Sequence, residues 1–438
     1  MATNGNSSAA PAAFEAPELS HREILIVFGT LMLAMLLAAL DQTVLATALP
    51  TIVGELGGLE HLAWVITAYM LASTSSVPLY GKLGDMYGRK IMLQVAIAMF
   101  IIGSIAAGVS QDMTQIIGSR VIQGLGAGGL MATSQAIIGD ILSPRERGKY
   151  IGYLASVFAF ASVAGPLIGG FFTDGIGWRW VFYINVPLGL LALFVTTKVL
   201  KLHRHRVKHH IDFIGSALLV AGVSSVLLAT TWGGNQYAWG SVEIVGLFVG
   251  GALLLTTFIF FEQRAEEPII PLSLFKDQTF RISSALGLLL GMAMFGAIAF
   301  VPVYLQVVKG VSATESGLRT VPMMVGIVLT SIVAGRMITK TGQYRRYPVF
   351  GTAMASLGLF LLSRLSADSS VWFLSVDLFI LGIGIGLVMQ ITLLAVQNSV
   401  NFRDMGAATS GVTFFRSMGG AFGVAMFGSI LSNRLSHN

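Results

Sequence analysis

The sequence GKLGDMYGRK at residues 81–90 separates two long apolar runs, and the organisation of the chain follows from it. It predicts a tight loop between two membrane spans, because glycines punctuate a short polar segment there. Opposite charges fall within one turn of two helix ends, where they can pair and complement the helix dipoles. Such a loop can hold one conformation and release it in another. The residues expected to form this conformational loop are Gly81, Asp85, Gly88, Arg89 and Lys90.

The composition of the whole chain is that of a membrane protein. Of its 438 residues 54% are apolar and 11% are charged, and the mean hydropathy is +0.77, whereas soluble domains carry about 25% charged residues. Long continuous apolar runs predict membrane-spanning helices, and they exclude the alternating strands of an outer-membrane barrel. The net charge of +6 comes from basic residues between the apolar runs, which indicates membrane topology and no nucleic-acid binding.

Thirteen apolar segments are candidate membrane spans. They cover residues 24–49, 62–81, 91–109, 114–138, 149–172, 179–199, 211–231, 242–261, 280–305, 317–338, 347–365, 371–396 and 407–431. With the amino terminus in the cytoplasm, twenty Lys and Arg residues fall at cytoplasmic ends and loops, five fall on the other side, and two lie within spans. Because basic residues concentrate in cytoplasmic loops, this distribution predicts a multi-pass protein with a cytoplasmic amino terminus.

The spans fall into blocks. Residues 1–23, which are rich in Ala, Ser and Pro, are expected to form a disordered cytoplasmic tail, and residues 24–200 a six-helix bundle. Residues 201–279 form a linker region with two extra transmembrane helices, and residues 280–438 a second bundle with five helices. The predicted fold is therefore an all-α transmembrane bundle of two pseudo-symmetric six-helix halves plus two inserted helices. We expect the last helix of the second half to be missing.

The second bundle carries a degenerate copy of the stretch at residues 81–90. In GRMITKTGQYRR, at residues 335–346, Gly335 and Gly342 keep the glycine spacing. Thr339 stands where the first copy has its acid, Asp85. The two halves are therefore expected to be parallel repeats of one unit.

Two ionisable residues lie deep inside predicted spans. Asp41 lies in the outer half of the first span, where an ionised carboxylate costs about 2.5–3.5 kcal/mol on insertion scales. Arg120 lies at a comparable depth in the fourth span, and a guanidinium does not lose its proton to escape burial. Each is expected to face a cavity or a partner. For Asp41 the alternatives are a structural hydrogen-bond acceptor and a titrating, coupling carboxyl; for Arg120 they are a structural and a proton-transfer role.

The fifth span contains SVAGPLIGG at residues 162–170. The pair Gly165-Pro166 is expected to bend the helix, and the small residues Gly169 and Gly170 are expected to allow a close interface with a neighbouring helix. A generic helix kink is the alternative interpretation.

The second half holds fewer ionisable groups inside its spans, together with neutral amides. Arg416 is the costliest of them, so a cavity-facing or acid-paired position is expected. Asp377 lies near the outer end of its span, where an interfacial position is the alternative. The residues that we take as candidates for a substrate cavity are Gln306, Asp377, Gln390 and Arg416.

No catalytic or cofactor-binding pattern is found, so no enzyme activity, metal or cofactor is predicted. Histidines at positions 203, 205, 209 and 210 cluster in one basic loop, where solvated charge is expected rather than a metal site. No Walker loop follows a strand, and the chain has no cysteine. An ion gradient is therefore the expected energy source, and intramembrane carboxylates favour protons.

Several of these stretches resemble the major facilitator superfamily of secondary transporters. Residues 81–90 resemble its loop between helices 2 and 3, and RVIQGLGAGG at residues 120–129 resembles its fourth-helix motif, in which the arginine is tied to proton transfer. LLAALDQTVLATALP at residues 36–50 is similar to the first-helix motif of drug:proton antiporters, which makes Asp41 the proton-coupling candidate. Residues 162–170 resemble the antiporter signature. The extra pair of spans favours the fourteen-span branch.

The resemblance implies a proton-coupled antiporter that exports hydrophobic drugs, cationic ones included, by alternating access. It implies a location in the bacterial inner membrane or a fungal equivalent. The expected partners are the lipid bilayer, protons and hydrophobic small molecules, with the protein acting as a monomer. A dedicated exporter of one metabolite, siderophore or lipid is one alternative. A membrane sensor that transports nothing is the other, and Asp41 counts against it.

Overall fold

The computed structural model describes residues 20–57, 62–142, 144–200, 212–234, 236–265, 268–311, 315, 318–366, 369–401 and 404–436. Within these ranges the chain is helical, apart from one isolated bridge between Gly233 and Tyr237. The predicted all-α class is confirmed. The four clustered histidines and most of the predicted amino-terminal tail lie outside the described residues.

The helices are α1 (His21–Leu56), α2 (Leu62–Tyr87), α3 (Arg89–Val109), α4 (Met113–Ile141), α5 (Pro144–Asp174), α6 (Trp180–Tyr183), α7 (Asn185–Val199), α8 (Phe213–Trp232), α9 (Val242–Glu262), η2 (Leu272–Lys276), α10 (Gln278–Val307), α12 (Val321–Thr341), α13 (Arg346–Leu362), α14 (Val371–Ser399) and α15 (Met405–Ser436). The predicted span at residues 179–199 is divided into α6 and α7 at Ile184.

The first helix shows how local sequence sets the helix ends. Ser20 Oγ accepts a hydrogen bond from the Glu23 backbone N–H at 3.3 Å, and Glu23 Oε2 accepts from the Ser20 N–H at 2.9 Å. This reciprocal capping box satisfies two backbone donors that a helix leaves free at its start. At the other end Gly57 has a φ of 73°, which ends α1.

The ten-residue loop predicted at residues 81–90 is much shorter in the structure. α2 continues through Gly81 to Tyr87 and α3 begins at Arg89, so the connection is Gly88 alone, with a φ of 98° that L side chains rarely adopt. The prediction of a loop was therefore wrong in its extent. The last turns of α2 remain helical because they pack against the first turns of α15, where Gly81 lies against Ser410.

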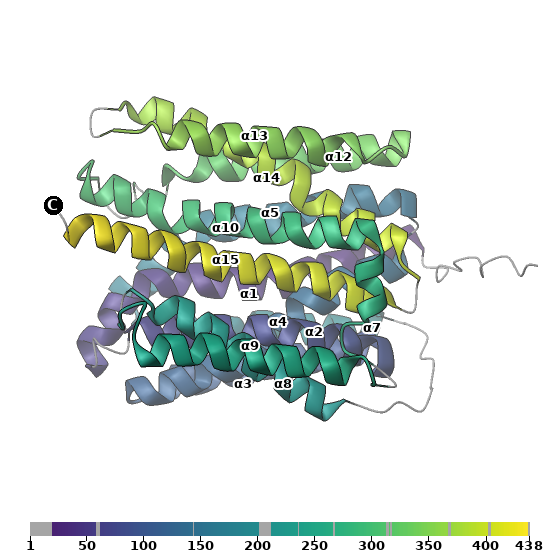
Figure 1. Cartoon of the computed structure of the whole chain (residues 1–438), viewed down its shortest axis with the longest axis horizontal. Coiled ribbons are helices and arrows are strands. Elements are labelled where there is room, and N and C mark those ends of the chain that lie inside the picture. The colour runs from purple at the N-terminus through teal and green to yellow at the C-terminus, as the bar shows by residue number, and fades with distance from the viewer. Residues whose placement is uncertain are drawn as a thin grey trace, which may run out of the picture.

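Long helices lie side by side along the longest axis of the molecule (Figure 1). α4 packs between α2 and α3, and α1 packs on α5 and α7. α10 packs on α15, while α14 contacts both α12 and α13. We call α1–α7 the amino bundle and α10–α15 the carboxyl bundle. α8 and α9 pack on each other, and α8 also contacts α2 and α15.

The two bundles meet mainly through α5 with α12 and α2 with α15, and also through α4 with α15 and α5 with α14. The end of the molecule that carries the turn between α2 and α3 is called the Gly88 end below, and the opposite end, where α1 stops, is called the Gly57 end. In Figure 1 α15 runs from the Gly88 end on the right to the marked carboxyl terminus on the left.

Ten helical segments in the described part of the chain are long and apolar enough to cross a membrane. They lie in α1, α3, α4, α5, the α6–α7 pair, α8, α9, α10, α12 and α14. The other predicted spans correspond to α13, which is a shorter apolar helix, and to α2 and α15, which carry polar residues and glycines where they pack on each other. The polytopic helical bundle predicted from the sequence is thus confirmed.

Candidate functional site

Asp41 lies at the centre of a buried polar cluster in the amino bundle. Its Oδ2 accepts a hydrogen bond from Arg120 Nη1 at 2.5 Å, and its Oδ1 accepts from Gln123 Nε2 at 2.6 Å and from Asn185 Nδ2 at 3.0 Å. Ser104 Oγ accepts from the same two amide groups, at 2.8 Å from Gln123 and 3.3 Å from Asn185. Four helices, α1, α3, α4 and α7, therefore supply one network, which we call the Asp41 cluster.

The positive member of the Asp41 cluster is held from several sides. Arg120 Nη1 also donates to Gln123 Oε1 at 2.6 Å, and Nε donates to the Val65 carbonyl at 3.2 Å. The guanidinium carbon lies 4.1 Å from the centre of the Tyr69 ring, whose hydroxyl donates to the Ala38 carbonyl on α1. Arg120 and Asp41 are each 1% exposed, so the pair is closed to water in this structure.

Every identified hydrogen-bond partner of Asp41 is a donor. A carboxylate has only acceptors, whereas a carboxylic acid must place one O–H against an acceptor. The cluster therefore matches the ionised form of Asp41, and adding a proton would set an O–H against N–H groups. One proton thus changes both the charge and the hydrogen-bond pattern at a point where four helices meet.

Glycines on α4 bring the neighbouring helices close enough for this network. A Cβ on Gly124 would lie 2.5 Å from the Tyr69 carbonyl oxygen on α2, and a Cβ on Gly126 would lie 2.6 Å from the Phe100 nitrogen on α3. Any larger residue at these positions would force α2 or α3 away from α4. Small residues permit such close helix packing in membranes, and here they set the depth at which Arg120 reaches Asp41.

The turn between α2 and α3 forms a second buried charge cluster at the Gly88 end. Arg89 Nη2 donates to Asp85 Oδ1 at 2.9 Å, and its Nη1 lies 2.8 Å from Asp140 Oδ1 and donates to the Ala136 carbonyl at 2.6 Å. Asp85 Oδ2 accepts from the Ala407 N–H at 3.0 Å. Since Ala407 lies in the first turn of α15, the carboxylate of the amino bundle stabilises a helix start of the carboxyl bundle.

Other polar contacts join the bundles at the same end. Arg147 Nη1 donates to the Gln397 carbonyl at 3.2 Å and to Asn398 Oδ1 at 3.1 Å. Gln135 accepts from Gln397 Nε2 at 3.1 Å through its carbonyl and from Thr413 Oγ1 at 2.8 Å through its side chain. Together with Asp85 and Ala407 these residues form the interbundle contact, which holds the Gly88 end closed.

Lys90 does not join the charges of Asp85 and Arg89. Its Nζ donates to the Thr197 carbonyl at 2.9 Å, so it ties α3 to the last turn of α7.

The sequence did not single out Gln123, Asn185, Asp140 or Gln135, because neutral amides and a helix-end acid are common in ordinary helices. The only available signal was that Gln123 follows Arg120 by three residues, which places the two side chains on one helix face.

A prediction follows from the packing of Gly81. A Cβ there would overlap the Ser410 side chain and lie 2.9 Å from the Gly406 carbonyl oxygen, so α2 and α15 would have to separate. We expect Gly81→Ala to destabilise the protein by about 1–3 kcal/mol, as overpacking does. Thermal unfolding in detergent measures this. Gly84→Ala is the matched control, since its Cβ would meet only Arg89 Cγ at 3.4 Å, and equal melting temperatures for the two variants would contradict the prediction.

The GPLIGG segment lies on α5, which packs along α1. A Cβ on Gly165 would lie 2.5 Å from Thr43 Cβ, and Thr43 Oγ1 donates to the Ala161 carbonyl at 2.9 Å. The absence of a side chain at Gly165 thus leaves room for Thr43, which follows Asp41 by two residues. A Cβ on Gly170 would meet open space, and Gly169 is buried. Pro166 lies within α5, but its side chain is outside the described part of the structure.

The candidates from the second half are not brought together. Arg416 on α15 borders a narrow hollow between α10, α14 and α15. Asp377 and Gln390 are buried on α14, and neither lines this hollow. Gln306 lies on α10, and its side chain is outside the described part of the structure.

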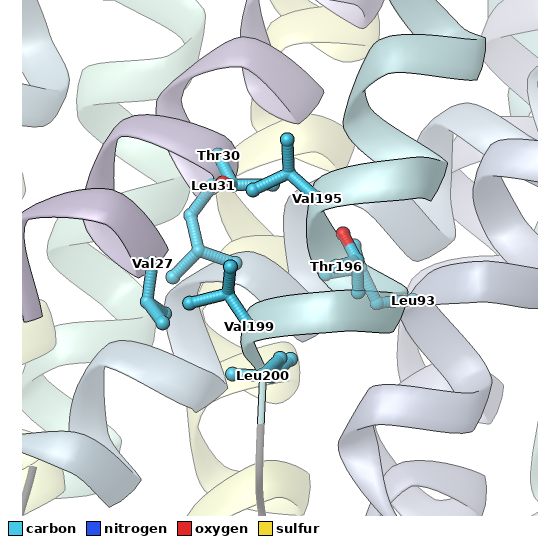
Figure 2. Close-up of a pocket in the computed structure, with 8 residues that line it drawn as sticks. All are labelled: Val27, Thr30, Leu31, Leu93, Val195, Thr196, Val199 and Leu200. Atoms are coloured by element: carbon cyan, nitrogen blue, oxygen red, sulfur yellow. The ribbon is translucent and has the colours of Figure 1, made fainter. Parts of the chain in front are cut away.

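A second hollow lies between α1, α3 and α7 and has a volume of about 170 Å³ (Figure 2). Its walls are apolar apart from Thr30 and Thr196, whose hydroxyls donate to the Ile26 and Ala192 carbonyls of their own helices. It therefore offers no free donor to a ligand, and it lies apart from the Asp41 cluster.

A further, exposed ion pair lies at the Gly57 end of the amino bundle. Glu55, ten residues beyond the apolar span Arg22–Leu45, accepts from Arg179 Nη1 at 2.7 Å and from Trp178 Nε1 at 2.8 Å. These two hydrogen bonds lower the pKa of Glu55 below its ordinary value. Its stabilising contribution is therefore present at neutral pH and is lost as the pH falls through the pKa of the folded state.

Apolar helices long enough to cross a membrane, packed around a buried ion pair, define a polytopic membrane protein. The chain belongs to the major facilitator superfamily, whose family model, described as Major Facilitator Superfamily, matches residues 31–424. Transporters of this superfamily are not enzymes, as predicted.

Relatives and solved structures agree with this assignment. The chain is 42% identical over 428 residues to an uncharacterized MFS-type transporter of Mycobacterium tuberculosis (strain ATCC 25618 / H37Rv), covering 97% of this chain and 62% of that protein. It is 40% identical over 413 residues to the multidrug transporter protein MdtP of Bacillus subtilis (strain 168), covering 94% and 76%. The crystal structure of the human organic anion transporter MFSD10 shares the fold, with a TM-score of 0.69, 14% identity and coverage of 93% and 94%.

Proposed function

We propose that this transporter is a proton-coupled antiporter that exports hydrophobic small molecules, cationic drugs included, by alternating access. The observation that carries the proposal is the Asp41 cluster, in which one buried carboxylate is held by donors from α4 and α7. The name of the Bacillus subtilis relative, a multidrug transporter, supports export of drugs. The chain covers only part of that relative, and the activity of the whole protein is part of the proposal.

In the proposed cycle the Gly88 end faces the cytoplasm, which the distribution of basic residues supports. The interbundle contact at that end then corresponds to an outward-facing state. A proton that reaches Asp41 from outside removes its charge and weakens its attraction to Arg120. The freed helices shift, the interbundle contact opens, and the site is exposed to the cytoplasm, where the proton leaves and the next drug enters.

The cycle requires a second arrangement of the helices. Asp41 is closed to water in this structure, so water must reach it in at least one other state. The interbundle contact is built from hydrogen bonds of 2.8–3.2 Å between polar groups, and such contacts can be exchanged for water when the end opens. We further propose that the protein works as a monomer in the inner membrane.

Transport in proteoliposomes tests the proposal. We expect an imposed pH gradient to drive the transport of ethidium, a lipophilic cation, across the membrane. Protons should move down their gradient in the opposite direction. A pH-sensitive dye and ethidium fluorescence report the two flows. Absence of any substrate-dependent proton flux would contradict the proposal and favour a membrane sensor. A resistance profile across unrelated toxic cations and dyes separates a multidrug pump from an exporter of one metabolite.

A further inference from the structure

Arg416 is a buried cation that is paired with no acid in the described part of the chain. It lies in the eleventh position after the start of α15 and is 8% exposed. Within the described ranges it makes no hydrogen bond and no ion pair with another residue. α10 and α15 contain no Asp or Glu, and α14 contains only Asp377. Thr392 is the α14 residue whose hydroxyl lies at the Arg416 hollow. At a rise of 1.5 Å per residue, Asp377 lies about 22 Å from Thr392 along α14.

The other buried arginines behave differently. Arg89 is held by Asp85 and Asp140, Arg120 by Asp41, and Arg147 by backbone carbonyls and Asn398. An isolated buried charge costs several kcal/mol of stability. Because the other three buried arginines have partners, we expect the unpaired guanidinium of Arg416 to serve a function that offsets this cost. The missing partner of Arg416 is then a group that arrives with a ligand.

The residues that line the narrow hollow beside Arg416 have the chemistry for such a ligand. Leu290 and Met294 line it from α10, and Met389 and Thr392 line it from α14. The Thr392 hydroxyl donates to the Val388 carbonyl at 3.0 Å, which leaves its oxygen as an acceptor only. Arg416 therefore supplies the free donors, and the methionines supply an adaptable apolar wall.

Gly287 keeps the hollow open and lets α10 approach α15. A Cβ there would lie 3.7 Å from Arg416 Cβ and 3.4 Å from the Val412 carbonyl oxygen, which is ordinary contact. Only a longer side chain at this position would extend into the space that the ligand needs. Arg416 thus forms the charged side of the hollow, and a larger residue in place of Gly287 would fill the hollow from the opposite helix.

We infer that Arg416 binds a negatively charged group of the transported molecule, so that the substrates of this protein include amphiphilic anions. The inference rests on the proposed export function and names a substrate class for it. A guanidinium binds carboxylate, sulfonate or phosphate groups through paired N–H donors, which a point charge does less well. The apolar part of the same molecule lies against Leu290, Met294 and Met389. Because Arg416 is the charged residue of this lining and no acid lies beside it there, the Arg416 hollow keeps a net positive charge.

Binding of a matched pair of probes tests the inference without any gradient. Dansyl-phenylalanine carries a carboxylate, and its methyl ester has the same skeleton without the charge. With the purified chain in detergent at pH 7, dansyl fluorescence gives both dissociation constants. We expect the anion to bind at least about tenfold more tightly than the ester, as a charge-assisted hydrogen bond permits. Arg416→Gln is expected to reduce this preference to less than about twofold by weakening the anion alone.

Further variants keep the result interpretable. Arg416→Lys keeps the charge and is expected to retain a reduced preference for the anion, so it serves where the Gln variant does not fold. Gly287→Leu is expected to weaken both probes. Arg364→Gln removes an exposed guanidinium and should change neither. An unchanged anion preference in Arg416→Gln, or equal binding of the two probes to the wild type, would overturn the inference. Since no proton gradient is present, Asp41→Asn should keep the preference even if proton coupling fails.

Discussion

Asp41→Asn is expected to abolish substrate-driven proton flux, reducing it to the level of empty proteoliposomes. Asparagine has nearly the shape of aspartate but carries no titratable group, so the swap of one proton at this position cannot occur. In the folded protein the variant also leaves Arg120 without its partner at 2.5 Å. Breaking a buried pair in this way costs about 3–5 kcal/mol. Loss of transport alone would therefore not separate a coupling role from a structural one.

A second substitution makes the separation. In Asp41→Asn/Arg120→Gln both charges are gone, and the amides can hydrogen-bond with Gln123, Asn185 and each other. We expect the double variant to recover most of the thermal stability lost in Asp41→Asn, because replacing both members of a buried pair is often neutral. Proton flux is expected to stay absent. Recovery of substrate-driven alkalinisation in the double variant would show that the Asp41 carboxyl is a structural acceptor.

Asp85→Asn is expected to open the Gly88 end. The variant weakens two contacts at once: the 2.9 Å pair with Arg89 and the 3.0 Å hydrogen bond from Ala407 at the start of α15. A loss of about 3 kcal/mol is enough to shift a two-state equilibrium more than a hundredfold. A large population with separated bundles is therefore expected, and the exchange of drug for protons should slow.

Spin-label distances measure this opening. The chain contains no cysteine, so labels at Lys198→Cys in the amino bundle and Gln343→Cys beside the carboxyl bundle give one defined pair. Pulsed electron resonance should show a longer distance in Asp85→Asn than in the labelled parent chain. Glu315→Gln is the control, since it removes an acid from an exposed pair with Arg319 outside the interbundle contact. Identical distance distributions in parent and Asp85→Asn would refute the role of Asp85.

The charged residues of the amino bundle illustrate how far sequence reasoning reaches. An ionised side chain inside an apolar span is costly, so Asp41 and Arg120 were identifiable from hydropathy alone. Their neutral neighbours Gln123, Asn185 and Ser104 were not, since amides and hydroxyls occur in many spans at small cost. The prediction of a loop at residues 81–90 was wrong in its extent for a related reason. Its polarity predicted a break, but the packing of α2 on α15 keeps all but Gly88 helical.

The sequence by itself determined that this is an all-helical membrane protein, because long apolar runs have no other stable form in a bilayer, where each backbone group must be satisfied within its own helix. It also determined which charges would be costly. Only the tertiary structure decided which residues are in contact. It pairs Asp41 with Arg120 across 79 residues and Asp85 with Ala407 across 322, and it places no acid of the described residues against Arg416. The reason is that contacts between helices depend on register and rotation, which close packing of side chains sets jointly for many spans.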